Sequence, residues 1–172
     1  MKTWEDVIKF HGHECPGLAI GYKVAQAAQK YLEIDFSEDE EIVCIAENDA
    51  CGLDAIQVMI GCTIGKGNLL IKLRGKSVYH FYNRKTNKSV RMALKRKSHN
   101  MERDEYKNYL IDTNAIDLFD ISDTYIEIPE KARIFLSHEC ETCGEKTSEQ
   151  FIRFQGGHKV CLDCYRDYKR FF

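Results

Sequence analysis

The residues with the clearest chemistry are four cysteines near the C-terminus. They form two C-x₂-C pairs with seventeen residues between them: Cys140, Cys143, Cys161 and Cys164. Two residues between thiolates let one tight turn aim both sulfurs at one tetrahedral ion, and the spacing between the pairs suits a four-cysteine zinc site. Residues 149–155 alternate like a strand, and Gly156-Gly157 is a hairpin signal. Residues 138–172 are therefore expected to form a zinc ribbon.

The ribbon is expected to depend on its metal. About 35 residues bury too little apolar area to fold alone, so a structural zinc ion should supply the folding free energy. His138 and His158 lie in the same segment. Four sulfurs already complete a tetrahedral shell, so both histidines are expected at the surface.

A second group with ligand chemistry lies near the N-terminus, in FHGHECPG at residues 10–17. His11, His13 and Cys15 alternate, and alternate side chains of an extended segment project to one side. Two imidazoles and a thiolate there would bind zinc or another transition metal. The alternative is a pair of surface histidines beside a buried cysteine.

A third group, NDACGLDAIQVMIGCTIGKGN at residues 48–68, contains Cys51 and Cys62. Cys51 is predicted to start a helix, where exposed N–H groups favour the thiolate. Eleven helical residues separate the two sulfurs by ~16 Å, too far to share one ion. Cys51 is thus the expected ligand unless the helix breaks near Gly61, and Cys62 a pocket or core residue. Cys44 lies in an apolar run and is expected in the core.

Two further residues of this segment are pocket candidates. Asp54, one turn after Cys51, would serve as a general base beside a bound metal, although an aspartate on a helix surface is the commoner case. Lys66 and the glycine-rich turn at residues 65–68 would hold an anionic substrate, or else form a loop that needs no ligand. Asp54, Cys62 and Lys66 are therefore the catalytic or pocket candidates.

The elements that must position these groups follow from apolar periodicity and turn residues. Helices are predicted at 17–32, 52–63 and 102–116, and strands at 41–46, 69–73, 77–82, 89–95 and 125–128. Residues 74–76 and 83–88 are expected to be hairpin turns. The order predicts an α+β fold with helices on a small, mainly antiparallel sheet. The expected domains are a core at residues 1–130 and the ribbon at 138–172.

Composition and charge narrow the class of protein. At 172 residues with 44% hydrophobic and 30% charged residues, the chain has the profile of a soluble globular protein without a membrane span or signal peptide, so a cytoplasmic location is expected. Residues 66–107 hold thirteen Lys or Arg against three acids, whereas residues 138–172 hold six of each sign. A neutral ribbon has no net attraction for phosphates, so nucleic acid is an unlikely partner.

The two N-terminal motifs carry a family resemblance. FHGHECPGLAIGYKVA at residues 10–25 and CGLDAIQVMIGCTIGKGNL at residues 51–69 resemble the FmdE family, which takes its name from one of the subunits of formylmethanofuran dehydrogenase. The resemblance implies an α+β core with a metal site, a ribbon domain and a homodimer. It implies metal positions at His11, His13 and Cys15, with Cys51 in the same pocket and Cys62 as a further candidate; His11 is either a ligand or a gating residue.

Three functions compete on these grounds. The first is a metal-binding accessory or subunit protein of molybdenum- or tungsten-dependent C1 oxidoreduction. The chain shows no cysteine run spaced for iron–sulfur clusters, so it is not expected to be the complete redox enzyme. The second is a free-standing zinc enzyme in which His13, Cys15 and Cys51 leave a coordination position for water or substrate. The third is a zinc-ribbon nucleic-acid binder that uses the basic stretch and its aromatic residues.

Overall fold

The computed structural model describes residues 2–95 and 101–170, which divide into two compact units, Met1–Ala132 and Arg133–Phe172. The first unit holds four α-helices among its described residues: α1 (Trp4–His11), α2 (Pro16–Leu32), α3 (Gly52–Ile60) and α4 (Arg103–Asp112). Its strands are β1 (Ile42–Ala46), β2 (Leu69–Ile71), β3 (Val78–Asn83), β4 (Lys88–Leu94) and β5 (Phe119–Ser122), with a 3₁₀ turn, η1, at Ala115–Leu118. The predicted α+β class is confirmed.

The strands form one five-stranded sheet in the order β2-β1-β3-β4-β5. Only β1 and β2 run parallel; the pairings of β1 with β3, β3 with β4 and β4 with β5 are antiparallel. Residues 83–88 turn the β3–β4 hairpin as predicted. The hairpin expected at residues 74–76 is wrong, because β2 and β3 both pair with β1, on opposite sides of it.

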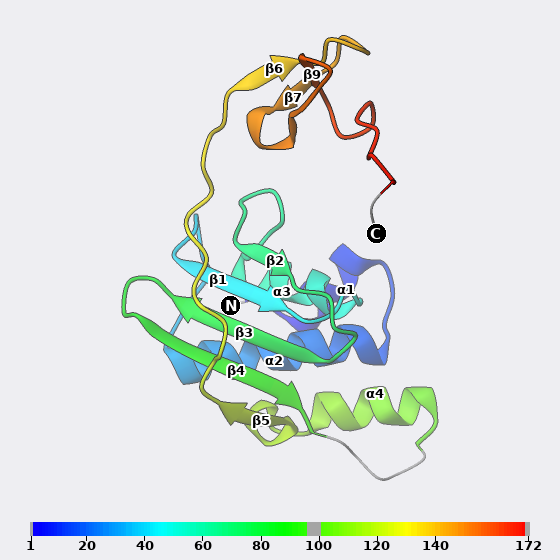
Figure 1. Cartoon of the computed structure of the whole chain (residues 1–172). Coiled ribbons are helices and arrows are strands. Elements are labelled where there is room, and N and C mark those ends of the chain that lie inside the picture. Colours follow the sequence, from blue (N-terminus) through cyan, green and yellow to red (C-terminus); the bar gives the residue numbers. More distant parts are fainter. Residues whose placement is uncertain (1, 96–100, 171–172) are drawn as a thin grey trace. The chain divides into compact units, whose positions relative to one another are not determined.

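The helices lie on one face of this sheet (Figure 1). Alternate residues of β1 and β3, such as Cys44 and Phe81, pack there against fully buried residues of α2 and α3 such as Leu18 and Ile56. Pro16 is the first residue of α2, where its missing N–H removes no intrahelical bond. α3 ends at Gly61, whose φ of 78° is the left-handed conformation of a helix C-cap. That end comes three residues before the predicted one.

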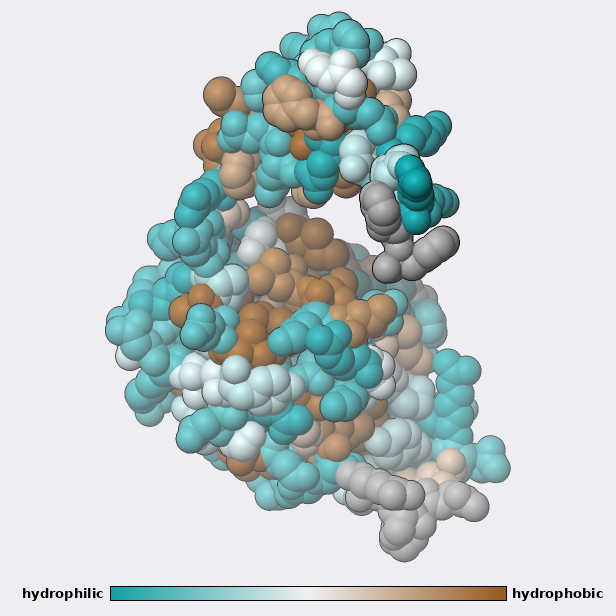
Figure 2. Space-filling model, viewed as in Figure 1, coloured by the Kyte–Doolittle hydropathy of each residue, from teal (hydrophilic) through white to brown (hydrophobic). Residues whose placement is uncertain are grey.

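The segment from Asp123 to Ala132 crosses the other sheet face (Figure 1). Ile126 packs there with Val43, Ile45 and Tyr82. The strand predicted at residues 125–128 is wrong, because these residues lie over a sheet face rather than along an edge; the pairing strand is β5. Figure 2 shows hydrophobic surface gathered on this side of the unit, bordered by hydrophilic side chains.

The second unit contains two short hairpins. β6 (Ser137–Glu139) pairs with β7 (Lys146–Ser148), and β8 (Arg153–Gln155) pairs with β9 (His158–Val160). A 3₁₀ turn, η2, occupies Glu149–Phe151, so the strand expected over residues 149–155 forms only in its second half. Gly156 and Gly157 make the β8–β9 turn, both with positive φ. Among helices at residues 2–95 and 101–170, none has the length and apolar character that a membrane crossing requires.

Candidate metal centres

The N-terminal motif sits where two helices meet. α1 ends at His11, Gly12 turns the chain with a φ of 96°, and Cys15 is the N-cap of α2. The motif is therefore not one extended segment, as the sequence suggested, because His11 is helical. Even so, the donor atoms of His11, His13 and Cys15 lie within 4.8 Å of one another. The turn at Gly12 folds the two histidines together, with ring centroids 4.5 Å apart.

His11 is oriented by a carboxylate. Its Nδ1 lies 2.7 Å from Oδ2 of Asp54, and Gln57 Nε2 donates to the other carboxylate oxygen of Asp54 at 3.2 Å. The second ring nitrogen, Nε2, is buried and has no hydrogen-bond partner. Metal-bound histidines commonly give their other ring nitrogen to a carboxylate in this way. His11 therefore fits a metal ligand that binds through Nε2, and Asp54 fits the residue that fixes its ring.

Cys51 lies beside Cys15 because α2 and α3 approach closely at glycines. A Cβ on Gly21 would lie 2.1 Å from the carbonyl oxygen of Gly52, so neither helix tolerates a side chain at the crossing. A Cβ built on Gly17 would lie 3.9 Å from the sulfur of Cys15 and 3.8 Å from that of Cys51. Cys51 is outside the group whose donor atoms lie within 4.8 Å, but its sulfur faces the same site.

The acidity of Cys51 differs from the expectation for a helix N-terminus. Burial, followed by the neighbouring Cys15 sulfur, raises the pKa of the Cys51 thiol. The backbone N–H bond that lowers this pKa is the smaller effect. A nearby cation would reverse the balance, because a metal stabilises the thiolate directly.

Cys62 and Lys66 lie in different surroundings. Cys62 is fully buried beyond Gly61, its thiol donates to the Ile42 carbonyl oxygen at 3.5 Å, and burial raises its pKa to about 12. Lys66 Nζ donates to the carbonyl oxygen of Ser37 at 2.7 Å and lies 5.5 Å from the centre of the Phe36 ring. Neither residue joins the donor group of His11. Cys44 is likewise fully buried in β1.

The ribbon cysteines converge more completely. The sulfurs of Cys140, Cys143, Cys161 and Cys164 all lie within 4.8 Å of one another. Each pair has a tight turn: Gly144 N donates to Cys140 O at 2.8 Å, and Cys164 N donates to Cys161 O at 3.2 Å. Gly144 has a φ of 77°, which a side chain would strain. Four sulfurs in such a group suggest zinc binding.

Backbone N–H groups prepare one ribbon sulfur for a metal. The pKa of Cys140 is lowered to about 6, chiefly by N–H groups of Cys143 and Cys161 that point at its sulfur. The pKa of Cys164 is raised to about 12, mainly because its thiol shares a hydrogen bond with Cys161. Four thiolates without a cation would repel one another, so this set of donors fits a divalent ion.

The ribbon histidines lie outside this group. His158 Nδ1 lies 2.7 Å from Oε2 of Glu141, and Oε1 of the same carboxylate accepts the Lys159 N–H at 3.0 Å. Both side chains of the His158–Glu141 pair are exposed. His138 in β6 is also absent from the sulfur cluster.

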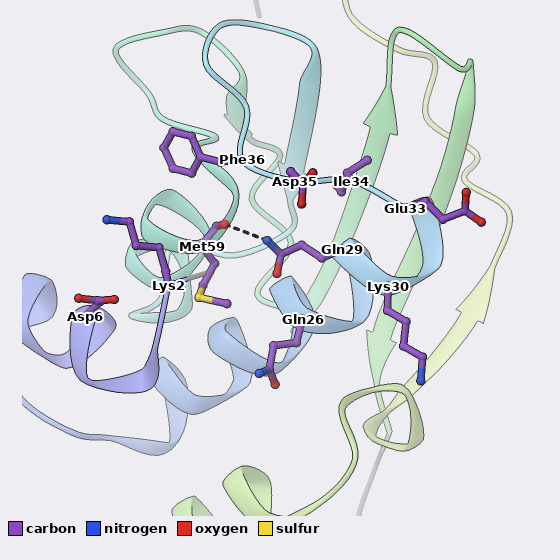
Figure 3. Close-up of a pocket in the computed structure, with 10 residues that line it drawn as sticks. All are labelled: Lys2, Asp6, Gln26, Gln29, Lys30, Glu33, Ile34, Asp35, Phe36 and Met59. Atoms are coloured by element: carbon purple, nitrogen blue, oxygen red, sulfur yellow. Dashed lines mark hydrogen bonds between the residues drawn. The ribbon is translucent and has the colours of Figure 1, made fainter.

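A hollow lies beside α1, apart from both centres. A cavity of about 980 Å³ opens between α1, the end of α2 and α3, and none of its lining residues is a candidate ligand (Figure 3). Lys2, Asp6 and Phe36 also line a neighbouring hollow of about 500 Å³, which extends to Gln57. Gln57 connects this groove to the centre, because it bonds Asp54. Sequence reasoning missed Gln57, although its place one turn after Asp54 was a signal.

Known proteins share both sequence and fold with this chain. The protein-family model described as "FmdE, Molybdenum formylmethanofuran dehydrogenase operon" matches residues 10–142. A protein of Archaeoglobus fulgidus named "Probable S-adenosyl-L-methionine-binding protein" is 30% identical over 192 residues, which cover 93% of this chain and 51% of that protein. The chain thus spans about half the length of this curated relative, and the ligand in its name belongs to the longer protein.

A solved structure shares the fold. An FmdE-like protein of Syntrophus aciditrophicus, related to tungsten formylmethanofuran dehydrogenase, superposes with a TM-score of 0.68 at 24% identity. The match covers 93% of this chain and 88% of that one. At this identity the likeness concerns the fold.

Proposed function

The chain belongs to the FmdE family, and from that premise we propose that it binds two metal ions per chain. One is a structural zinc ion held by the four ribbon cysteines. The other is a zinc or related transition-metal ion held by His11, His13 and Cys15, with Cys51 as a fourth donor or close neighbour. Imidazole and thiolate donors suit zinc and other borderline metals.

The observation that carries this proposal is the buried, unpartnered Nε2 of His11. A buried polar atom without a partner costs free energy, so native proteins rarely leave one. The Nδ1 atom is held by Asp54, and the donor atoms of His13 and Cys15 lie within 4.8 Å. A cation at this point would satisfy the nitrogen and the sulfur together.

For the role of this centre, we propose an accessory or subunit protein of molybdenum- or tungsten-dependent formylmethanofuran oxidoreduction in the cytoplasm. The support is the family description, which names the molybdenum formylmethanofuran dehydrogenase operon. The family also leads us to propose a homodimer. Sedimentation equilibrium should then give twice the 20.0 kDa chain mass. Added protein should raise the turnover of a purified molybdenum or tungsten dehydrogenase that lacks this component.

Elemental analysis of the purified full chain tests the metal proposal. Wild type should carry about two metal ions per chain. His11→Ala combined with Cys15→Ser should remove one of them, and Cys161→Ser should remove the other. His158→Gln is the matched control, because it changes a histidine outside both centres and should retain both ions. A wild-type chain with a single ion would contradict the core centre.

The second candidate, a free-standing zinc enzyme, is favoured by the groove that extends to Gln57. A zinc ion with three protein ligands keeps a coordination position where it can activate water or polarise a substrate. Both carboxylate oxygens of Asp54 are engaged, one by His11 and one by Gln57. We therefore assign Asp54 to orienting His11 rather than to general base catalysis.

Cobalt substitution separates an open centre from a closed one. If three protein ligands hold the ion, azide or a small thiol should change the visible spectrum of the core cobalt. Cys51→Ala should weaken that response if Cys51 helps form the centre. A spectrum that ignores added ligands would mean four protein donors, and the enzyme candidate would fall behind the accessory one.

A further inference from the structure

The loop that carries the core donors is anchored by backbone at its two ends. At its start, Gly12 N donates to the carbonyl oxygen of Ile8 at 2.7 Å. At its end, the sulfur of Cys15 accepts the Leu18 N–H at 3.3 Å. Between these anchors, no backbone-to-backbone hydrogen bond within the described residues involves His13 or Glu14. The middle of the loop therefore depends on side-chain contacts for its position.

One such contact comes from a distant part of the chain. Lys107 of α4 donates from Nζ to Oε2 of Glu14 at 2.6 Å, across a separation of 93 residues. The lysine side chain is only 15% exposed, whereas Glu14 is 45% exposed. Asp104, its other acidic neighbour, lies 4.0 Å away and is 92% exposed. Lys107 is thus directed at Glu14, the residue between two candidate ligands.

We propose that Lys107 is a positioning residue for the core metal centre. This inference rests on the proposed function, because it assumes that His13 and Cys15 bind a metal. Holding Glu14 fixes the backbone on both sides of it, and so sets where the His13 imidazole and the Cys15 sulfur lie before the ion arrives. A donor set ordered in advance binds more tightly, because less conformational entropy is lost on binding.

The covered position of the lysine gives this pair more weight than an open surface pair. Exposed ion pairs between flexible side chains contribute little, since water and salt compete with them. Lys107 instead extends along α4, which packs on α2, the helix that Cys15 begins. Outer partners of metal ligands typically change metal affinity by about 10- to 100-fold when they are removed. We expect an effect near the lower end, about tenfold.

The test uses the full chain with both centres loaded. Lys107→Met keeps a long side chain but removes the charge, and Glu14→Gln removes the acceptor charge. Each change should weaken cobalt or zinc binding at the core centre about tenfold in chelator competition. The double variant should be no weaker than either single variant, because the two residues act as one contact. Lys107→Arg restores a cation and should recover most of the affinity.

Lys85→Met is the matched control. Lys85 also pairs with a glutamate, Glu41 at 3.7 Å, but is 72% exposed and far from the motif in sequence. It should leave core metal affinity unchanged. In every variant the ribbon ion and the unfolding temperature of chelator-treated protein should match wild type, since a lost positioning contact does not change the fold.

The outcomes separate two kinds of failure. A wild-type chain that binds no core metal would refute the proposed function itself. A wild type that binds the ion, with Lys107→Met binding it equally well, would overturn this inference alone. A Lys107→Met chain that lost affinity only together with thermal stability, and was not rescued by arginine, would show that α4 docking and not ligand positioning is the role of the pair.

Discussion

The two units of this chain solve the problem of folding differently. The first buries a large cluster of apolar side chains between the helices and one face of a five-stranded sheet. The second buries three residues together, Cys140, Val160 and Cys161, and two of these are candidate metal ligands. Hydrophobic burial can support the first unit without a metal. The second has almost nothing else to hold its hairpins.

The two centres differ in the same sense. The ribbon sulfurs come from two short turns that also make most of the unit's backbone bonds, so binding and folding are one event. The core donors come from the end of α1, the start of α2 and, for Cys51, the start of α3. These helices are placed by packing around the glycines at residues 17, 21 and 52. A site on such a scaffold is available for ligand exchange, because its occupancy need not decide whether the unit folds.

The largest expected effect separates the units most directly. Cys161→Ser should unfold the ribbon, because structural zinc contributes about 10–16 kcal/mol of apparent binding free energy and needs all four thiolates. The core should keep its cooperative thermal transition. Limited proteolysis would then remove residues beyond about 133 and leave the first unit intact. Full zinc content together with a protease-resistant ribbon would contradict this dependence.

A smaller effect is expected in the core, from a change in volume rather than in ligands. Gly21→Ala places a methyl group against the backbone of Gly52, so α2 and α3 must separate. Overpacking of this kind typically costs about 1–3 kcal/mol, and it should also move Cys51 away from Cys15. Urea unfolding and core cobalt affinity would measure the two consequences.

Gly65→Ala is the control for that change, because a Cβ at Gly65 meets nothing within 4 Å. It should leave both stability and core metal affinity near wild type. Equal stability of the two variants would mean that the helix crossing is softer than the contact implies. Neither change should alter the ribbon zinc, since both lie in the first unit.

The sequence predicted what depends on local pattern. The C-x₂-C pairs, the helices that begin at Pro16 and Gly52, and the β3–β4 hairpin all follow from spacing and turn residues. The helix at Trp4–His11 was missed because it is short, and its amphipathic pattern was overshadowed by the histidines beside it. The strand at residues 125–128 was predicted wrongly, since Ile126 alternates with polar neighbours for a different reason, namely packing on a sheet face.

What the sequence lacked were the contacts between distant residues. Asp54 was considered as a base, but its partner His11 lies 43 residues away. Lys66 was considered for anion binding, whereas its ammonium group is engaged by the carbonyl oxygen of Ser37. The α2–α3 crossing decides which cysteine lies near Cys15, and it depends on glycines that carry no periodic signal.

The third expected effect comes from histidines in the two units. In the core, His80 Nε2 lies 3.0 Å from Oε1 of Glu47, and both side chains are almost fully buried. The Tyr125 hydroxyl also donates to Glu47, and His80 Nδ1 lies 2.7 Å from Thr124 Oγ1. Burial lowers the pKa of His80 despite the opposing effect of Glu47. Below pH ~6.5 the unfolded chain therefore binds a proton that the native state does not.

The sign follows from that difference. This histidine reduces the unfolding free energy of the core as the pH falls below ~6.5, by at most about 1.4 kcal/mol per pH unit for one proton. Urea midpoints of the core between pH 5 and 8 would give the slope. His80→Gln should flatten it, whereas His158→Gln, on the exposed ribbon pair, should leave it unchanged. A slope that His80→Gln does not alter would assign the dependence to other groups.

The smallest expected effect is the absence of salt-steep nucleic-acid binding by either unit. The ribbon is neutral over residues 138–172, and the basic stretch at residues 66–107 is divided among several loops, strands and α4. Several of its cations already have partners: Lys66 with Ser37, Arg84 with Pro129, Lys95 with Asp117 and Lys107 with Glu14. Arg96 and Lys97 lie outside the described residues.

Filter binding to single- and double-stranded DNA and RNA, across a salt series, would measure this. Each phosphate contact contributes about −0.7 to −0.9 to the slope of log affinity against log salt. A protein without a phosphate-binding face should show only weak binding and a slope shallower than about −2. The variant with Lys72, Arg74 and Lys76 all changed to Gln removes the charges of the β2–β3 loop and should bind as weakly as wild type. Tight binding with a slope steeper than about −4, lost in that variant, would place a nucleic-acid face on the core. The ribbon would then have to be reconsidered as part of a binding protein rather than as a stabilising module, because a zinc ribbon next to a phosphate-binding surface has a direct use.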